Sequence, residues 1–283
     1  MFFSSINYDQ PVFRPPGESL SSILQVTLGC SWNRCAFCEM YSSKQFHIRK
    51  FEDIRSDIRI LAAAEGNAKK VFLADGNAFV LKTDKLLRII KEINGHYKRV
   101  NRISSYALPT DIINKSKTEL SELRQAGLKL LYIGIETGDD DLLRRINKSE
   151  TYESTYQGIN KAHEAGIDTS VMILTGLGGE NYSRQHAINS AKLVNLLNPK
   201  FLSTLSLSLP LGQAHFEKKF NGTFIHQTKT ELAEELKLFI ENLTVESTIF
   251  RSDHVSNNIV LKGVLSKDKR KLIETIDKNL SRK

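Results

Sequence analysis

The stretch Gln-Ala-Gly-Leu-Lys-Leu-Leu-Tyr-Ile-Gly-Ile-Glu-Thr-Gly at residues 125–138 combines a helix ending, a strand and a polar turn. Gly127 follows apolar residues at helical spacing and fits the left-handed cap of a helix. Residues 129–135 are rich in Leu and Ile, which is typical of a buried parallel strand. The same ending recurs at Glu164-Ala165-Gly166-Ile167. The sequence therefore predicts repeated strand and helix units.

The repeat extends in both directions along the chain. Gly66 and Gly95 also close apolar-periodic segments, and we expect them to be left-handed helix caps as well. Six short apolar runs are predicted to be strands. They are Ile23–Leu28, Lys70–Ala74, Arg102–Ser105, Lys129–Ile135, Thr169–Leu174 and Phe201–Leu207. Six units predict an α/β fold that is a partial (β/α)6 TIM-like barrel of parallel strands, and a doubly wound sheet is the alternative.

The repeat of strand and helix units ends near residue 210, and this divides the chain into three predicted parts. Residues 1–20 form an N-terminal extension, residues 21–210 the barrel, and residues 211–283 a C-terminal appendage that covers the barrel. The appendage contains helical patterns near Glu231–Asn242 and Lys267–Leu280. We expect it to pack on the barrel because a separate domain of that size would be marginally stable alone.

Composition narrows the class of protein. The chain has 283 residues, 40% of them hydrophobic and 25% charged, as in ordinary globular proteins. No apolar run reaches the roughly 18 residues of a membrane span, so we expect a cytoplasmic protein with no membrane contact. The net charge of +8 has two explanations, an RNA partner or lysine-rich solvated helix faces. The sequence does not choose between them.

The three cysteines of the chain lie close together. Cys30, Cys35 and Cys38 form a C-x4-C-x2-C pattern after the first predicted strand, which is no disulfide framework of a secreted fold. Three thiolates on one loop can hold an iron–sulfur cubane and leave one iron open, whereas structural zinc normally takes four ligands. His47 would be the fourth ligand in the zinc alternative. In a third alternative, the three cysteines are unrelated buried thiols that bind no metal.

Polar residues and glycines follow the predicted strands at the end where chemistry occurs in parallel α/β folds. In chain order they are Cys30, Asp75-Gly76-Asn77, Ser105-Tyr106, Glu136-Thr137-Gly138, Thr175-Gly176 and Pro210-Leu211-Gly212. Because the carboxyl ends of parallel strands share one edge, these residues are predicted to form one rim.

The cysteine loop resembles that of the radical S-adenosylmethionine (SAM) superfamily, with Phe37 in the aromatic position before the last cysteine. The usual spacing of that superfamily is C-x3-C-x2-C, so this loop has one extra residue. The chain is similar to the coproporphyrinogen III oxidase-like group of iron–sulfur oxidoreductases. The resemblance implies a partial (β/α)6 barrel, a [4Fe–4S] cluster on Cys30, Cys35 and Cys38, and bound SAM.

The same resemblance implies the SAM site. Asp75-Gly76-Asn77 occupies the place of a Gly-Gly-Glu motif that receives the amino group of SAM, with Asn77 in place of the acid. Glu136 would lie near the ribose or the amino group. Thr175 and Gly176, with the following Gly178-Gly179, would lie beside the adenine, and Phe37 beside the cofactors.

Several other residues are weaker candidates. Arg144 and Arg145 could pair with the SAM carboxylate, or be surface charges. Tyr41, Tyr106 and His254 could face the reacting carbon; for the tyrosines a place in the barrel wall is the alternative. His254 lies in the polar segment 251–258, which is either a recognition loop or a solvent loop with local turn hydrogen bonds.

The activity that the resemblance implies is one-electron reductive cleavage of SAM, followed by hydrogen abstraction from a small-molecule substrate. The electron would come from a donor such as flavodoxin or ferredoxin. Three cysteines leave none for a second cysteine-ligated cluster. The alternatives are a non-catalytic haem- or cluster-binding chaperone on the same scaffold and a zinc-dependent RNA-binding protein.

Overall fold

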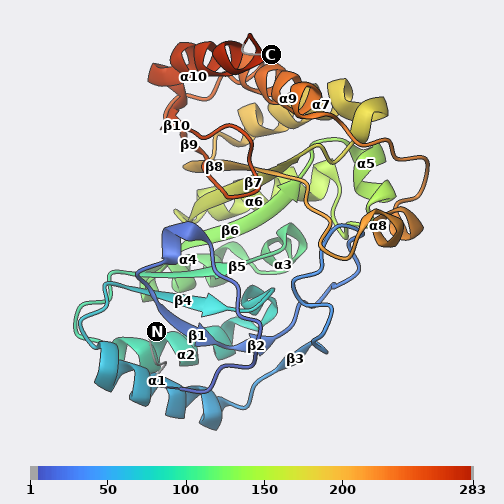
Figure 1. Ribbon diagram of the computed structural model, residues 1–283. Helices are drawn as coiled ribbons and strands as arrows, with labels where there is room; N and C mark the ends of the chain where they lie inside the picture. The colour runs from blue at the N-terminus through green and yellow to red at the C-terminus, as the bar shows by residue number, and fades with distance from the viewer. Residues whose placement is uncertain (1–5, 282–283) are drawn as a thin grey trace. The chain divides into compact units, whose positions relative to one another are not determined.

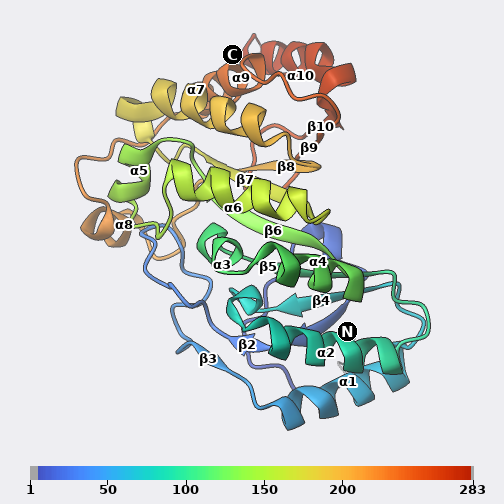
Figure 2. The same ribbon diagram turned by 180° about the vertical axis from the view of Figure 1, so that it is seen from behind.

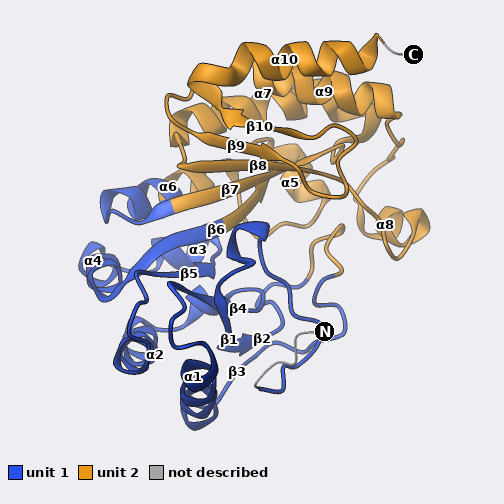
Figure 3. Cartoon of the chain, turned by 60° about the vertical axis from the view of Figure 1, so that its left-hand side comes forward, with its two compact units in different colours: residues 1–33, 40–132, 158–168 blue, residues 34–39, 133–157, 169–283 orange. Residues whose placement is uncertain are grey.

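The computed structural model describes residues 6–281, so the first five residues of the predicted N-terminal extension lie outside it. The chain divides into two compact units (Figure 3). The first unit contains residues 1–33, 40–132 and 158–168, and the second contains residues 34–39, 133–157 and 169–283. Each unit contains its own cluster of buried apolar residues.

The first unit contains a parallel sheet. Its strands are β1 (Ser22–Gln25), β4 (Lys70–Ala74), β5 (Arg102–Tyr106) and the first part of β6 (Leu128–Glu136). They pair in that order, and a register shift interrupts β5 and β6 between Ile103 and Ser104. Strands β2 (Thr27–Leu28) and β3 (His47–Ile48) form a separate antiparallel pair. Strand β4 is buried from Val71 to Ala74, as expected for a strand covered on both faces.

Helices α1, α2 and α4 cover one face of this sheet (Figure 2). The helical elements of the first unit are η1 (Pro16–Glu18), α1 (Phe51–Glu65), η2 (Ala78–Val80), α2 (Thr83–His96), α3 (Pro109–Ile113) and α4 (Lys117–Ala126). Helix α4 starts at a capping box of Ser116 and Glu119 and ends at Gly127, whose φ of 119° is left-handed. On the sheet, Ile23, Phe72 and Ala74 form a small core with four partly buried residues, Tyr8, Val12, Tyr106 and Tyr132.

The second unit contains the rest of β6 and the strands β7 (Asp168–Thr175), β8 (Phe201–Ser206), β9 (Ile249–Ser252) and β10 (Leu261–Val264). Strand β8 pairs in parallel with β7 and β9, and β9 pairs antiparallel with β10. Helices α7 and α9 lie side by side, as do α9 and α10 (Figure 1). The C-terminal part of the chain therefore adds two strands to the helices expected there.

The helices of the second unit are α5 (Asp140–Arg145), the first part of α6 (Tyr152–Glu164), α7 (Gly179–Leu197), α8 (Gln213–Lys219), α9 (Lys229–Glu241) and α10 (Leu265–Leu280). A core cluster joins α5 to the segment after β8. It contains Ala36, Leu142, Leu143, Ile146, Leu174, Leu177, Phe216, Phe220 and Phe224. Ala36 in this cluster belongs to the cysteine loop, so the core of the second unit holds part of that loop.

Five of the six predicted strands agree with the structure to within one residue at each end, and the first is divided into β1 and β2. Gly127 and Gly166 have the expected positive φ, 119° and 75°. The same prediction was wrong for two glycines. Gly66 ends α1 with a right-handed φ of −59°, and Gly95 lies inside α2, which continues to His96 and is closed by Tyr97. Neither glycine therefore adopts the left-handed conformation that the prediction required.

No helix within residues 6–281 has the length and apolar character that crossing a membrane requires. The unit boundaries differ from the predicted domain boundaries at 20/21 and 210/211, which stay predictions.

Candidate functional site

Cys30 follows β2 in the first unit, and the residue before it is fixed by two backbone hydrogen bonds. Gly29 has a left-handed φ of 73°. Its N–H donates to Oδ2 of Asp75 at 2.9 Å, and its carbonyl accepts from the N–H of Gly76 at 3.0 Å. Cys30 is half-buried. The first cysteine is therefore held against the turn that follows β4.

Gly76 lets that turn approach Cys30 closely. A Cβ at position 76 would lie 2.6 Å from Cβ of Cys30 and 3.0 Å from the ring of Tyr41. Real Cβ atoms do not come that close to a neighbouring backbone, so any other residue here would push the cysteine loop away. Close packing against Cys30 thus explains why position 76 is a glycine, independently of cofactor binding.

Asp75 is fully buried and adopts a left-handed φ of 67°, an uncommon conformation for a residue with a side chain. Both oxygens of its carboxylate are engaged. Oδ2 accepts from Gly29 and from Nζ of Lys44 at 2.9 Å, and Oδ1 accepts from Nε2 of Gln25 at 3.1 Å. Because the buried charge is paired and hydrogen-bonded, Asp75 serves to fasten the loop around Cys30.

Asn77 is also fully buried, and its amide is only partly satisfied. Nδ2 donates to Oγ of Ser31 at 2.9 Å and to Oδ2 of Asp111 at 2.5 Å. Oδ1 is buried and has no hydrogen-bond partner. An unpaired buried carbonyl oxygen is costly, so this atom is a candidate acceptor for a ligand.

Cys35 and Cys38 belong to the second unit, on residues 34–39. The N–H of Ala36 donates to the carbonyl of Ile146 at 2.8 Å, and Phe37 packs against the core cluster of that unit. The N–H of Cys38 donates to the carbonyl of Cys35 at 3.2 Å and closes a turn. None of the three cysteines is in a disulfide.

Glu136 ends β6 with a left-handed φ of 61° and is 4% exposed. Its Oε1 accepts from Nζ of Lys148 at 3.1 Å, and its Oε2 is buried with no hydrogen-bond partner. Burial by itself lowers the pKa of Lys148, but Glu136, Cys35 and Cys38 together raise it above its ordinary value. A buried lysine ammonium is therefore paired with the Glu136 carboxylate, and its charge interacts with the two cysteines of this unit.

The turn after β7 is held by helix α9. Gly176 has a φ of 85°, and its N–H donates to Oε1 of Glu235 at 2.7 Å. His186 contacts the same carboxylate, with its Nε2 3.7 Å from Oε1, and its Nδ1 is 2.8 Å from Oγ1 of Thr137. Both side chains are buried. Sequence reasoning missed Glu235 and His186 because neither follows a strand.

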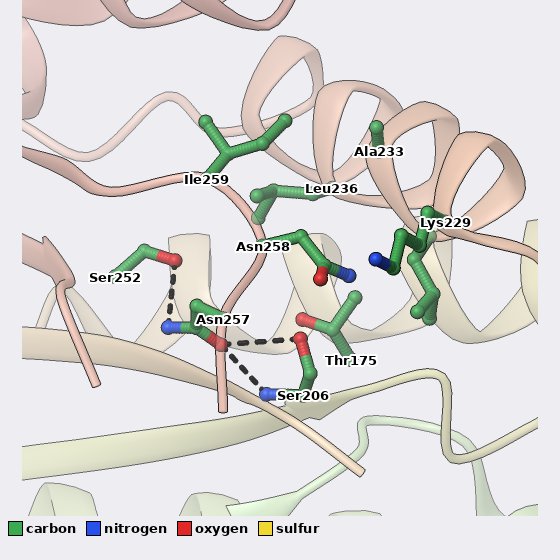
Figure 4. A pocket seen from close by; sticks show the side chains of 10 residues that line it. Thr175, Ser206, Lys229, Ala233, Leu236, Ser252, Asn257, Asn258 and Ile259 are labelled. Atoms are coloured by element: carbon green, nitrogen blue, oxygen red, sulfur yellow. Dashed lines mark hydrogen bonds between the residues drawn. The ribbon is translucent and has the colours of Figure 1, made fainter. Parts of the chain in front are cut away.

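A pocket lies beside Thr175 at the end of β7 (Figure 4). Its lining is apolar along α9, where Leu232 and Leu236 contribute, and polar at Lys229 and Asn258. In Figure 4 the side chains of Lys229 and Asn258 reach into the same space beside Thr175. The lining thus mixes apolar side chains with groups that can form hydrogen bonds.

Segment 251–258 is fastened to the sheet of the second unit through Asn257. Its Oδ1 accepts from the N–H of Ser206 at 2.7 Å, and its Nδ2 donates to the carbonyl of Thr204 at 2.8 Å. Nδ1 of His254 lies 2.8 Å from Oγ of Ser256, two residues along the chain. The local turn therefore accounts for His254, while Asn257 joins the loop to β8.

The other candidates have structural surroundings. Arg144 is exposed beside Asp141, and Arg145 donates to Asp141 at 2.9 Å and to the carbonyl of Asn221 at 2.6 Å. Two tyrosines pack edge-on, Tyr41 against Phe13 and Tyr106 against Phe72. His47, the zinc alternative, is exposed, with Nδ1 3.1 Å from the carbonyl of Gln45.

The donor set fits the cofactors that the cysteine loop implies. Three thiols lie within nine residues. Each unit, taken by itself, offers one buried oxygen without a partner that can accept from an ammonium or hydroxyl donor, Oδ1 of Asn77 in the first and Oε2 of Glu136 in the second. In the part of the chain that the structure describes, no three His, Cys, Asp or Glu side chains are arranged as a metal site. The ligand assignment thus rests on donor chemistry and spacing.

Comparison with protein families identifies the class. The family model of the radical SAM superfamily matches residues 24–191, which is more than half of the chain. The chain belongs to the radical SAM superfamily. This confirms the resemblance found in the cysteine loop, and with it the cofactors at the level of the family, which uses a [4Fe–4S] cluster and SAM.

Curated relatives of this radical SAM protein are distant. It is 26% identical over 134 residues to the haem chaperone HemW of Bacillus subtilis, covering 47% of this chain and 35% of the relative. It is 23% identical over 199 residues to HemW of Buchnera aphidicola, covering 66% and 51%. A GTP 3′,8-cyclase of Clostridium perfringens is 27% identical over 210 residues, covering 72% and 58%. The chain spans between 35% and 58% of the length of these relatives.

Solved structures support the predicted fold class. Coproporphyrinogen III oxidase (HemN) from Escherichia coli aligns with a TM-score of 0.59 at 18% identity, covering 78% of this chain and 51% of that one. Methylornithine synthase (PylB) aligns with a TM-score of 0.54 at 14% identity, covering 93% and 81%. The fold is thus α/β with a mostly parallel sheet, consistent with a partial TIM-like barrel.

Proposed function

We propose that this radical SAM protein is an enzyme that cleaves SAM reductively and abstracts hydrogen from a small-molecule substrate. The observation that carries the proposal is the C-x4-C-x2-C loop within the region that matches the radical SAM family model. Cys30, Cys35 and Cys38 would hold the [4Fe–4S] cluster with one iron left for SAM. When bound, cluster and SAM supply a one-electron cleavage of a carbon–sulfur bond, chemistry that no side chain of the protein can perform.

The protein contributes positions and charges. Asp75 and Gly76 fasten the segment that carries Cys30, and Ala36 and Phe37 fasten the segment that carries Cys35 and Cys38. Within each unit, the segment that carries the cysteines is thus supported by its neighbours. Lys148 places a positive charge near two of the thiols, which stabilises their thiolate forms.

SAM would be held by acceptors that have no partner in the protein. Oδ1 of Asn77 would receive the ammonium, and Oε2 of Glu136 would receive the ribose hydroxyls or the same ammonium. The pocket beside Thr175 and Gly176, with apolar α9 side chains and the polar Asn258, suits the adenine. The two acceptor oxygens of Asn77 and Glu136 are buried, so water competes little with a ligand there, whereas Asn258 is exposed.

The proposed partners follow from the chemistry. A cluster of this kind must be reduced before each cleavage, so we expect a one-electron donor such as flavodoxin or ferredoxin and a cytoplasmic location. An RNA partner remains an explanation of the net charge of +8, and no residue of the proposed site requires one.

The test is anaerobic reconstitution with iron and sulfide, followed by dithionite reduction with SAM. We expect about four irons per chain and formation of 5′-deoxyadenosine, measured by chromatography. Cys35→Ala should lose the cluster absorption and the product. Ser43→Ala, an exposed change five residues after Cys38, should retain both. One zinc per chain, or unchanged iron in Cys35→Ala, would contradict the ligand assignment.

A second function, a non-catalytic haem chaperone, is favoured by the similarity to two HemW proteins. The same preparation separates the two. A reconstituted, reducible protein that binds haem in a spectral titration, and yields no 5′-deoxyadenosine with or without cell extract, would replace the enzyme proposal. Product formation without haem binding would exclude the chaperone.

A further inference from the structure

The carboxylate of Asp111 lies against an amide that the sequence places at the SAM ammonium. Asp111 is on the short helix α3, which follows β5, and Asn77 follows β4. Oδ2 of Asp111 accepts from Nδ2 of Asn77 at 2.5 Å. The two residues are 34 positions apart in the chain, so the sequence alone gave no reason to connect them.

The hydrogen bonds fix the orientation of the Asn77 amide. Nδ2 has two hydrogens, and its two partners are Oγ of Ser31 and Oδ2 of Asp111. A reversed amide would set its carbonyl oxygen against the carboxylate of Asp111, two acceptors facing one another. The orientation with Oδ1 turned away from Asp111 is therefore the stable one, and it leaves Oδ1 buried without a partner.

An amide oxygen alone is a poor substitute for a carboxylate at an ammonium site. An ammonium facing a carboxylate gains a charge–charge attraction that a neutral amide does not provide. A carboxylate that accepts from the amide nitrogen polarises the amide and increases the partial negative charge on its oxygen. It also adds a full negative charge in surroundings where Asn77 is fully buried and screening is weak.

We propose that Asp111 supplies the negative charge of the SAM ammonium site, acting through the side-chain amide of Asn77, whose Oδ1 receives the ammonium. The inference rests on the proposed function, because it assumes that SAM binds at the Asp75-Gly76-Asn77 turn. In this chain the acid expected at position 77 is thus replaced by a pair, an amide at 77 and a carboxylate at 111.

The surroundings of Asp111 are built to keep it in place. Nζ of Lys161 donates to the carbonyl of Ile113 at the end of α3, at 2.6 Å. A Cβ at Gly158 would lie 2.6 Å from the carbonyl oxygen of Pro109, so α3 is packed tightly at its start. The nearby cation Lys115 donates to the carbonyl of Leu81 at 2.9 Å and lies over the ring of Phe79. The charge of Asp111 also acts on the Lys115 ammonium and opposes the lowering of the Lys115 pKa by burial.

The experiment measures SAM affinity of the reconstituted protein, by equilibrium dialysis with labelled SAM, together with the change in the electron paramagnetic resonance signal of the reduced cluster. Asp111→Asn should weaken SAM binding about tenfold with unchanged iron content. Asn77→Asp should also weaken it, because two carboxylates then face one another. The swapped pair Asn77→Asp with Asp111→Asn restores one amide and one carboxylate and should recover most of the affinity.

The matched control is Glu122→Gln, which removes an exposed carboxylate on α4 and should leave the affinity unchanged. A SAM analogue without the amino group isolates the ammonium. Wild type should bind SAM more tightly than this analogue, and Asp111→Asn should lose that preference. If Asp111→Asn folds poorly, the swapped pair still decides the question, because it keeps one carboxylate and one amide in contact.

The outcomes separate this inference from the proposed function. Wild type with a full cluster that does not bind SAM would overturn the proposed function. Wild type that binds and cleaves SAM, while Asp111→Asn binds it equally well or retains the preference for the amino group, would overturn the role of Asp111 alone. Failure of the swapped pair to bind better than either single variant would do the same.

Discussion

The side chain of Glu136, at the end of β6, occupies space that is free because residue 134 is a glycine. A Cβ at Gly134 would lie 2.1 Å from Oε1 of Glu136, the oxygen that accepts from Lys148. Gly134→Ala should therefore displace the carboxylate, break the ion pair and weaken SAM binding about tenfold, with far-ultraviolet circular dichroism unchanged. Equilibrium dialysis of the reconstituted variant measures the affinity.

The control for this change is Gly95→Ala. A Cβ at position 95 meets nothing within 4 Å, and the residue lies in helix α2. Alanine is the better helix former by about 1 kcal/mol, so this variant should be slightly more stable and bind SAM as wild type does. Unchanged affinity in Gly134→Ala would mean that Glu136 does not touch SAM.

His163 makes the stability of the first unit depend on pH. Burial lowers the pKa of His163, and the carboxylate of Asp168 opposes that effect only in part. Because its folded-state pKa lies below the unfolded value of about 6.5, the unfolded chain takes up the proton first as the pH falls. The stabilising contribution of neutral His163 is therefore present above the unfolded pKa and is lost as the pH falls through the folded one.

His163→Gln should remove this part of the pH dependence. Between about pH 7.5 and about pH 5, the free energy of unfolding of wild type should fall more steeply than that of the variant, as measured by urea denaturation at several pH values. Parallel curves for the two proteins over this range would show that His163 titrates as it does in the unfolded chain.

At the scale of elements, two helices begin with the same capping box and allow a matched comparison. Ser116 and Glu119 cap α4 in the first unit, and Thr228 and Glu231 cap α9 in the second. Loss of such a cap costs about 1 kcal/mol. Thr228→Ala should increase amide hydrogen exchange in α9 and in the Gly176 turn that Glu235 holds. Ser116→Ala should increase it in α4 only. Equal effects of the two variants on α9 would contradict this.

The elements that the sequence predicts well are those with a strong local signal. Strand β4 is an unbroken apolar run, and its predicted bounds agree with the structure. Strands β9 and β10 escaped prediction because each has only four residues and mixes polar with apolar ones, as in Ile249–Ser252. So short a pattern is indistinguishable from a loop without its pairing partners.

The candidate site shows the same limit in another form. The turn Asp75-Gly76-Asn77 is visible in the sequence because it follows a strand, but its partners Lys44 and Asp111 are not. Lys148 and Glu235 were missed for the same reason, since each reaches its partner across many residues. When the role of a side chain depends on a contact with a residue far away in the sequence, the local spacing of residues does not reveal it.

For the molecule as a whole, each compact unit contains its own cluster of buried apolar residues, so we expect a change inside one unit to loosen that unit first. Glu18 gives the sharpest case in the first unit. It is fully buried, and its Oε1 accepts from Arg102 at 2.7 Å, Tyr132 at 2.6 Å and Ser104 at 3.0 Å. Burial and then Glu18 raise the pKa of Tyr132, so the phenol keeps its proton and donates.

Glu18→Gln leaves Arg102 without its counter-charge and can place the amide N–H groups of Gln against other donors. The free energy of unfolding should fall by about 3 kcal/mol. Tyr132→Phe removes one hydrogen bond and should cost about 1 kcal/mol. Hydrogen exchange followed by mass spectrometry should then rise in β1, β4 and β5 in proportion to these losses, while β8, β9 and β10 exchange as in wild type. If Glu18→Gln accelerates exchange equally in both sets of strands, the units unfold together and the chain has one cooperative core rather than two.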